Sequence, residues 1–78
     1  MDKVIVYSKP NCINCVKVKN WLEGNDTPFE EINVMENEVA LNYVMNDLGF
    51  SGLPVTLVQG QEPVAGFVPE LLETYINK

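Results

Sequence analysis

Two cysteines are the residues of this chain whose type and spacing most directly suggest chemistry. Cys12 and Cys15 form a Cys-Ile-Asn-Cys motif, and a CxxC motif beside a strand-helix-strand pattern is typical of a redox dithiol. Residues three apart share a helix face, so the two sulfurs can reach bonding distance without a large backbone movement. We therefore interpret the pair as a dithiol that interconverts with a disulfide.

The two cysteines are predicted to have different roles. Cys12 stands at an expected helix start, where unpaired N–H groups and the positive end of the helix dipole favour a thiolate. Lys9, three residues earlier, is expected to support the same thiolate. Cys15 lies deeper in the helix and should be less exposed. We assign Cys12 as the attacking nucleophile and Cys15 as the resolving thiol.

Other uses of the pair stay open at this point. A structural zinc site normally takes four Cys or His ligands, whereas this chain has two Cys and no His. Zinc, or an iron-sulfur cluster, would therefore need carboxylates or a second chain. The two cysteines would then form a non-catalytic binding module. Alternatively, they are buried small hydrophobes. The spacing at a helix start favours the redox interpretation, with no metal bound.

Leu53-Pro54, just before an apolar run, is the second feature of interest. A proline at the first position of a strand is ordinary, so a turn or edge proline is the simpler interpretation. A cis peptide bond would turn backbone groups toward the cysteines, but the residues alone do not reveal the isomer.

Four strands are predicted to position these residues. They cover residues 4–7, 29–34, 55–58 and 63–65, and a Gln-Gly-Gln-Glu turn joins the last two as a hairpin. Short hairpins are antiparallel and strand-helix-strand crossovers are right-handed, so the simplest assembly is a four-stranded mixed sheet of the α/β class. Residues 1–78 should form one domain, because a chain of this length has room for a single core.

Three helices are expected to pack on the sheet. The first is capped by Asn11 and stopped by Gly24, the second covers residues 36–48, and the third starts at Pro69. The apolar residues that should face the sheet are Cys15, Val18 and Leu22 in the first helix, Leu41, Val44, Met45 and Leu48 in the second, and Leu71, Leu72, Tyr75 and Ile76 in the third. Trp21, Phe50 and the three methionines are predicted to serve core or near-surface packing.

The charge of the chain limits its partners. The net charge is −6, yet four of the five cations lie near the cysteines, at Lys3, Lys9, Lys17 and Lys19. A protein with this net negative charge is unsuited to binding nucleic acid, because its phosphates must be neutralised by clustered Lys and Arg. We expect the acidic residues Glu30, Glu31, Glu36 and Glu38 to form a solvated face, the alternative being that they orient a charged partner.

The N-terminal apolar run is too short for a signal peptide, and no stretch approaches the ~20 apolar residues of a membrane span. We therefore expect a cytoplasmic protein that does not contact a membrane. In such a reducing compartment a structural disulfide is not expected, which again favours redox chemistry for the cysteines.

With these motifs in view, the chain resembles the glutaredoxin branch of the thioredoxin fold over nearly its whole length. The resemblance is carried by the strand-loop-CxxC-helix, by Leu53-Pro54 and by the late Gly66-Phe67 pair. Val-Tyr-Ser-Lys-Pro-Asn-Cys-Ile-Asn-Cys at residues 6–15 and Gly-Phe-Val-Pro-Glu at residues 66–70 are most similar to NrdH-type redoxins.

The resemblance implies a thioredoxin fold with the order βαβαββα and a cis peptide bond at Pro54. It implies a monomer that holds no cofactor beyond its redox-active cysteine pair, takes electrons from NADPH through thioredoxin reductase and passes them to ribonucleotide reductase. It also places a partner-binding surface at Ile13, Asn14, Leu53, Pro54, Gly66 and Phe67.

Two differences from family sequence patterns affect which redox partner we expect for this chain. Where NrdH-type redoxins typically carry Ser-Gly-Phe-Arg-Pro, this chain has Ala65-Gly66-Phe67-Val68-Pro69 and lacks the hydroxyl and the guanidinium. Glutathione-using glutaredoxins usually have an aromatic residue inside the CxxC and a Gly-Gly followed by Asp near the last helix. Asn14 and Gly66-Phe67 stand there instead, so a glutathione-dependent glutaredoxin is the alternative rather than the first hypothesis.

Overall fold

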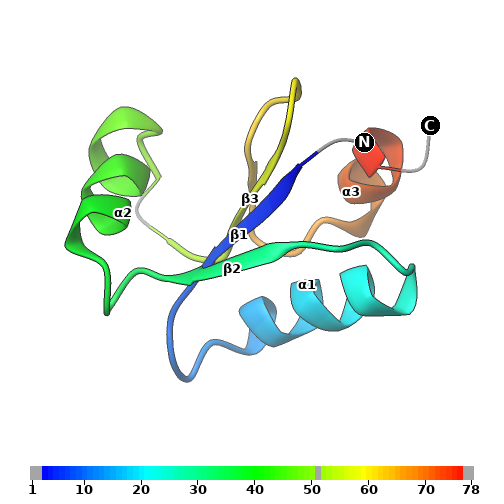
Figure 1. Cartoon of the computed structure of the whole chain (residues 1–78), viewed down its shortest axis with the longest axis horizontal. Helices are drawn as coiled ribbons and strands as arrows, with labels where there is room; N and C mark the ends of the chain where they lie inside the picture. The colour runs from blue at the N-terminus through cyan, green and yellow to red at the C-terminus, as the bar shows by residue number, and fades with distance from the viewer. Residues whose placement is uncertain (1–2, 51, 77–78) are drawn as a thin grey trace.

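The structure is a computed structural model that describes residues 3–50 and 52–76. Its strands are β1 (Val4–Ser8), β2 (Glu30–Asn33), β3 (Val55–Val58) and β4 (Val64–Ala65). Its helices are α1 (Ile13–Gly24), α2 (Glu38–Asn42) and α3 (Pro69–Ile76), and a π-helical turn, η1 (Tyr43–Asp47), continues α2. The predicted order of strands and helices is confirmed (Figure 1).

The four strands form one mixed sheet in the order β2-β1-β3-β4. β1 runs parallel to β2, as expected for a strand-helix-strand unit, and antiparallel to β3. β3 and β4 pair as the predicted antiparallel hairpin, with Val55 opposite Ala65 and Thr56 opposite Val64. β1 is therefore a central strand, and its C-terminal end delivers the chain to the loop that carries the cysteines.

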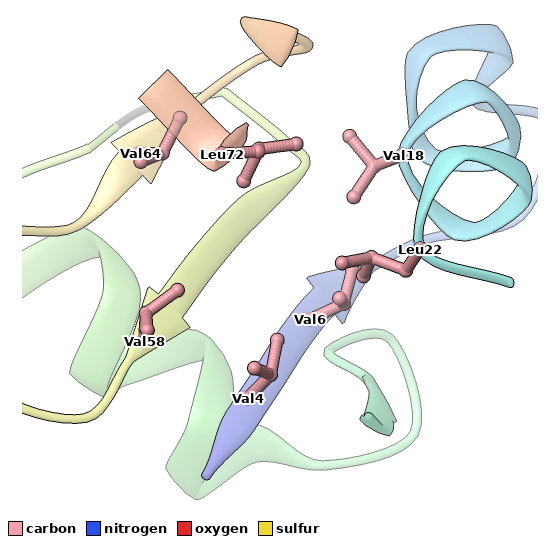
Figure 2. Packing of buried hydrophobic residues seen from close by; sticks show 7 residues of the cluster. All are labelled: Val4, Val6, Val18, Leu22, Val58, Val64 and Leu72. Atoms are coloured by element: carbon pink, nitrogen blue, oxygen red, sulfur yellow. The ribbon is translucent and has the colours of Figure 1, made fainter. Parts of the chain in front are cut away.

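Hydrophobic side chains fill both faces of the sheet. On the face covered by α1 and α3 the buried cluster consists of Val4, Val6, Val18, Leu22, Val58, Val64 and Leu72 (Figure 2). On the face covered by α2 and η1 it consists of Tyr7, Val34, Ala40, Val44 and Val55. Neighbouring strand residues point to opposite faces, so β1 supplies side chains to both clusters. α1 is thereby fixed against the sheet through the three apolar residues predicted for it, all of which are buried.

The predicted second helix is the largest departure. It starts at Glu38, after Asn37, whose side-chain oxygen accepts a hydrogen bond from the Ala40 N–H over 3.0 Å. Beyond Asn42 the chain widens into η1, where the Leu48 N–H donates to the Tyr43 carbonyl over 2.9 Å. A π-turn changes the angular spacing of side chains. The prediction that Met45 faces the sheet is consequently wrong, because Met45 is 51% exposed.

Of the other predictions about side-chain packing, some are confirmed and some are wrong. Trp21 and Phe50 pack against the two core clusters, as predicted. Met35 is exposed, and Met1 lies outside the described residues. In α3, Leu72 is fully buried while Leu71 is largely exposed, so the prediction that Leu71 contacts the core is wrong. Within the described ranges no helix has the length and apolar character needed to cross a bilayer.

Candidate active site

The two cysteines lie at the start of α1 and are joined by a disulfide, with their Cα atoms 5.2 Å apart. The Cys15 N–H donates a hydrogen bond to Sγ of Cys12 over 3.1 Å. Cys12 is partly exposed, whereas Cys15 is only 1% exposed. A partner can thus reach Cys12 but not Cys15, while the roles of nucleophile at position 12 and resolving thiol at position 15 stay a prediction.

Asn11 was expected to cap α1, and this prediction is wrong. The N-cap residue is Cys12, whose sulfur takes the place of the usual cap oxygen. Asn11 precedes it in the left-handed region, with φ of +59°, a conformation that Asn adopts more readily than most residues because its short polar side chain can hydrogen-bond locally. The bend at Asn11 brings the chain from β1 into α1 with a sulfur at the helix end. There the unpaired N–H groups stabilise negative charge.

The loop before β3 lies next to Cys12. The Leu53–Pro54 peptide bond is cis, as the resemblance implied, so the simpler interpretation of Pro54 as an ordinary turn proline is replaced. The Leu53 carbonyl oxygen lies 3.7 Å from Sγ of Cys12. The Gly66 N–H donates to the Pro54 carbonyl over 2.8 Å, which places the Gly66-Phe67 segment next to the cis-proline loop.

A cleft of about 560 Å³ opens beside the disulfide. Both cysteines line it, together with Lys9 and Ile13. Ile13 is 72% exposed and leaves an apolar side chain at the rim. The structure therefore places Lys9 and Ile13 at the cleft, whereas Leu53, Pro54 and Gly66 lie outside its lining. Phe67 is half-buried against the core, and Asn14 is exposed outside the cleft.

Three polar side chains in this cleft were not singled out from the sequence as site residues. The Ser8 hydroxyl donates to Oε2 of Glu31 over 2.7 Å, and Nζ of Lys19 donates to the same oxygen over 2.8 Å. The hydrogen bond from Lys19 is the main cause that holds the pKa of Glu31 below its usual value, and the bond from Ser8 adds to it against the opposing effect of burial. Ser8 is 2% exposed, so its hydroxyl is a fixed anchor.

Glu31 belongs to the acidic surface that the sequence predicted, and it also has contacts at the active-site cleft. Glu30, Glu36 and Glu38 are exposed, as predicted, and Glu30 pairs with Lys3 over 3.7 Å. The Glu31 side chain is also partly exposed, but its carboxylate is held at the active-site cleft. One signal of this was present in the sequence: Lys19 follows Cys15 by four residues, a spacing that places both on one helix face. The carboxylate partner depends on the pairing of β2 with β1 and required the fold.

No group of three or more His, Cys, Asp or Glu side chains that could hold a metal ion occurs among residues 3–50 and 52–76. The titratable side chains at the cleft are instead the two cysteines, Lys9, Lys19 and Glu31. An arrangement of two adjacent sulfurs, one reachable and one buried, suits thiol-disulfide exchange.

Comparison with known proteins gives the same chemistry. The sequence profile of the glutaredoxin family matches residues 4–62. The chain belongs to the glutaredoxin family. Within it, the glutaredoxin-like protein NrdH of Lactococcus lactis is 38% identical over 69 residues, which cover 88% of this chain and 93% of that protein.

Solved structures of glutaredoxin relatives agree with the fold. The thioredoxin-like protein BC3987 superposes with a TM-score of 0.87 at 35% identity, covering 95% of this chain and 100% of that one. The glutaredoxin-like NrdH-redoxin of Escherichia coli superposes with a TM-score of 0.84 at 28% identity, covering 92% of each chain. The expected thioredoxin fold is confirmed. The chain is an NrdH-type redoxin, a dithiol-disulfide oxidoreductase whose redox-active pair is Cys12 and Cys15.

Proposed function

We propose that this redoxin carries electrons from NADPH, by way of thioredoxin reductase, to ribonucleotide reductase in the cytoplasm. The observation that carries the proposal is the pairing of a reachable Cys12 with a buried Cys15 at the start of α1. The similarity to NrdH of Lactococcus lactis supports ribonucleotide reductase as the partner. The NrdH-redoxin of Escherichia coli is described as having a thioredoxin-like activity profile, which supports thioredoxin reductase as the electron source.

The exchange takes place in two steps. The Cys12 thiolate attacks one sulfur of the partner's disulfide, so that a Cys12-partner disulfide forms and the partner's second sulfur leaves as a thiolate. Cys15 then loses its proton and attacks Sγ of Cys12, which releases the first partner sulfur and closes the Cys12–Cys15 disulfide. The partner gains two electrons and two protons. Two electrons from NADPH, delivered by the reductase, restore the dithiol.

The surroundings of Cys12 serve the first step. The Cys15 N–H, which already donates to Sγ of Cys12, stabilises the thiolate, and Lys9 adds a cation at the same cleft. The partner docks across Cys12 on apolar and backbone groups. These groups belong to Ile13 and Asn14 on α1, to Leu53 in the cis-proline loop, and to Gly66 and Phe67 beside it. Pro54, which the resemblance placed on this surface, has a fully buried side chain and cannot contact a partner through it.

A coupled assay tests the electron source. Purified redoxin is supplied with NADPH and thioredoxin reductase, or with NADPH, glutathione and glutathione reductase. NADPH oxidation is followed with ribonucleotide reductase and its ribonucleotide substrate present, because reduction of the ribonucleotide forms the acceptor disulfide again in each cycle. We expect turnover with thioredoxin reductase and at most a small rate with glutathione. Turnover with glutathione alone would instead identify a glutathione-dependent glutaredoxin. The Cys12→Ser variant is the control, because any NADPH oxidation that remains with it does not pass through Cys12 and Cys15.

A further inference from the structure

Side chains from three elements meet at one carboxylate oxygen beside the disulfide. Ser8 ends β1, Lys19 lies on the second turn of α1, and Glu31 lies on β2. Oε2 of Glu31 accepts a hydrogen bond from each of the other two, over 2.7 Å and 2.8 Å. All three side chains line the same cleft as Cys12 and Cys15. None of the three takes part in the first step of the exchange described above.

Lys19 is placed to act on Cys15. It follows Cys15 by four residues, and side chains four apart on a helix are neighbours on one face. The side chain of Lys19 is 29% exposed, so its charge is screened less than that of a free surface lysine. The Glu31 carboxylate holds the ammonium group at the cleft instead of letting it extend into solvent.

The charged groups around Cys15 are few. Lys9 comes from the loop after β1, Cys12 caps α1, Lys19 lies on α1, and Glu31 lies on β2. β1 adds the neutral hydroxyl of Ser8, and the cis-proline loop approaches with a backbone carbonyl. Once Cys12 is tied up in a mixed disulfide it no longer titrates. Among the described residues, the charges that remain at this cleft are those of Lys9, Lys19 and Glu31.

From this arrangement we propose that Lys19 and Glu31 together set how readily Cys15 ionises, the Lys19 cation favouring the thiolate and the Glu31 anion opposing it. Ser8 keeps Glu31 in place. The inference rests on the proposed function, because it concerns the second step of that exchange. In this step the Cys15 S–H gives its proton to solvent, the thiolate attacks Sγ of Cys12, and the bond between Cys12 and the partner sulfur breaks.

The direction in which each variant shifts the pH of Cys15 ionisation distinguishes an electrostatic role of Lys19 and Glu31 from a packing role. A Lys19→Met change removes the cation and keeps the length of the stem, so ionisation of Cys15 requires a higher pH. A Glu31→Gln change keeps an oxygen that can accept from Ser8 and Lys19 but removes the anion, so ionisation occurs at a lower pH. If the pair had only a packing role, both variants would impair the resolving step in the same direction.

Stopped-flow reaction of the reduced protein with dithiobis-nitrobenzoate measures this step directly. Attack by Cys12 releases one thionitrobenzoate, and closure by Cys15 releases the second in a first-order phase that can be followed against pH. We expect Lys19→Met to move the pH midpoint of the second phase up, and Glu31→Gln to move it down, each by roughly half to one unit. Below the midpoint this corresponds to about threefold to tenfold in rate.

The pair formed by Lys3 and Glu30 supplies matched controls. It also links a lysine to a carboxylate on β2, over 3.7 Å, but neither residue lines the cleft. Lys3→Met and Glu30→Gln should leave the second phase at its wild-type midpoint. Shifts of the Lys19 and Glu31 variants in the same direction, or none, with a normal first phase would overturn this inference and leave the proposed function standing. Absence of the first phase in the wild-type protein would overturn both.

Discussion

The Cys15 N–H donates to Sγ of Cys12 over 3.1 Å, so Cys12 caps the helix that carries Cys15. In most helices an oxygen of Ser, Thr, Asp or Asn occupies this position. A sulfur there gains a hydrogen bond that becomes charge-assisted once the thiol ionises. The same contact holds the two cysteines at the separation that a disulfide needs.

This relationship predicts that the two cysteine variants behave differently. Cys15→Ser keeps the backbone N–H at position 15, so Cys12 should still attack a disulfide protein such as insulin. With no resolving thiol, the mixed disulfide should accumulate as a stoichiometric adduct, visible by intact-mass spectrometry and on non-reducing gels. Cys12→Ser should form no adduct under the same conditions. If Cys12→Ser forms the adduct and Cys15→Ser does not, the assignment of roles is reversed.

A second prediction concerns the bend at Asn11. Because its φ is +59°, Asn11→Ala should lower the free energy of unfolding by about 1 kcal/mol, whereas Asn11→Gly should stay within a few tenths. Urea denaturation measures both. Asn20→Ala, an exposed change inside α1, is the control and should be neutral or slightly stabilising. Equal loss for Ala and Gly at position 11 would show that a side-chain contact, and not the backbone conformation, is responsible.

The neighbouring leucines of α3 provide a third prediction. Leu72 is fully buried, and Figure 2 shows its side chain among those of the cluster that includes Val18 and Leu22 of α1, whereas Leu71 is 41% exposed. Leu72→Ala should cost about 2–5 kcal/mol, because it removes buried apolar area and leaves a cavity. Leu71→Ala should cost less than about 1 kcal/mol. Unfolding midpoints in urea compare the two variants, and similar losses would contradict the packing of α3.

The fourth prediction is an acid dependence of stability. The pKa of Glu31 is lowered in the folded protein, mainly by the hydrogen bond from Lys19 and then by that from Ser8. A carboxyl group whose pKa falls on folding adds stability above its unfolded pKa and loses it as the pH falls through the folded value. Glu31→Gln should therefore flatten the fall in unfolding free energy below the usual glutamate range. The effect is small because the carboxylate is partly solvated.

Ser8→Ala gives this prediction its control. In the wild-type background it removes one of the hydrogen bonds that favour the carboxylate, so the acid dependence should weaken. In the Glu31→Gln background it should leave the slope unchanged, because the titrating group is gone. A Ser8→Ala effect on the slope that persists without Glu31 would mean that another group titrates in this range.

Much of the fold follows from local patterns in the chain. Short β-branched runs, a cap and stop around α1, and a Gln-Gly-Gln-Glu turn are properties of neighbouring residues, and each led to the element that is present. The failures lie where local rules have near-equal alternatives. Asn11 and Cys12 can both precede a helix, and the apolar stripe of residues 41–48 does not reveal that the helix widens after Asn42.

The sequence by itself determined the chemistry, because two cysteines three residues apart at a predicted helix start share one helix face and their sulfurs can meet. Only the tertiary structure decided what surrounds them. Glu31 reaches the cleft because β2 pairs in parallel with β1, with Val6 beside Glu31 and Ser8 beside Asn33. Leu53 approaches Cys12 from 41 residues away. Such contacts depend on strand pairing and helix packing between residues that are far apart in the sequence. Patterns among neighbouring residues do not predict them.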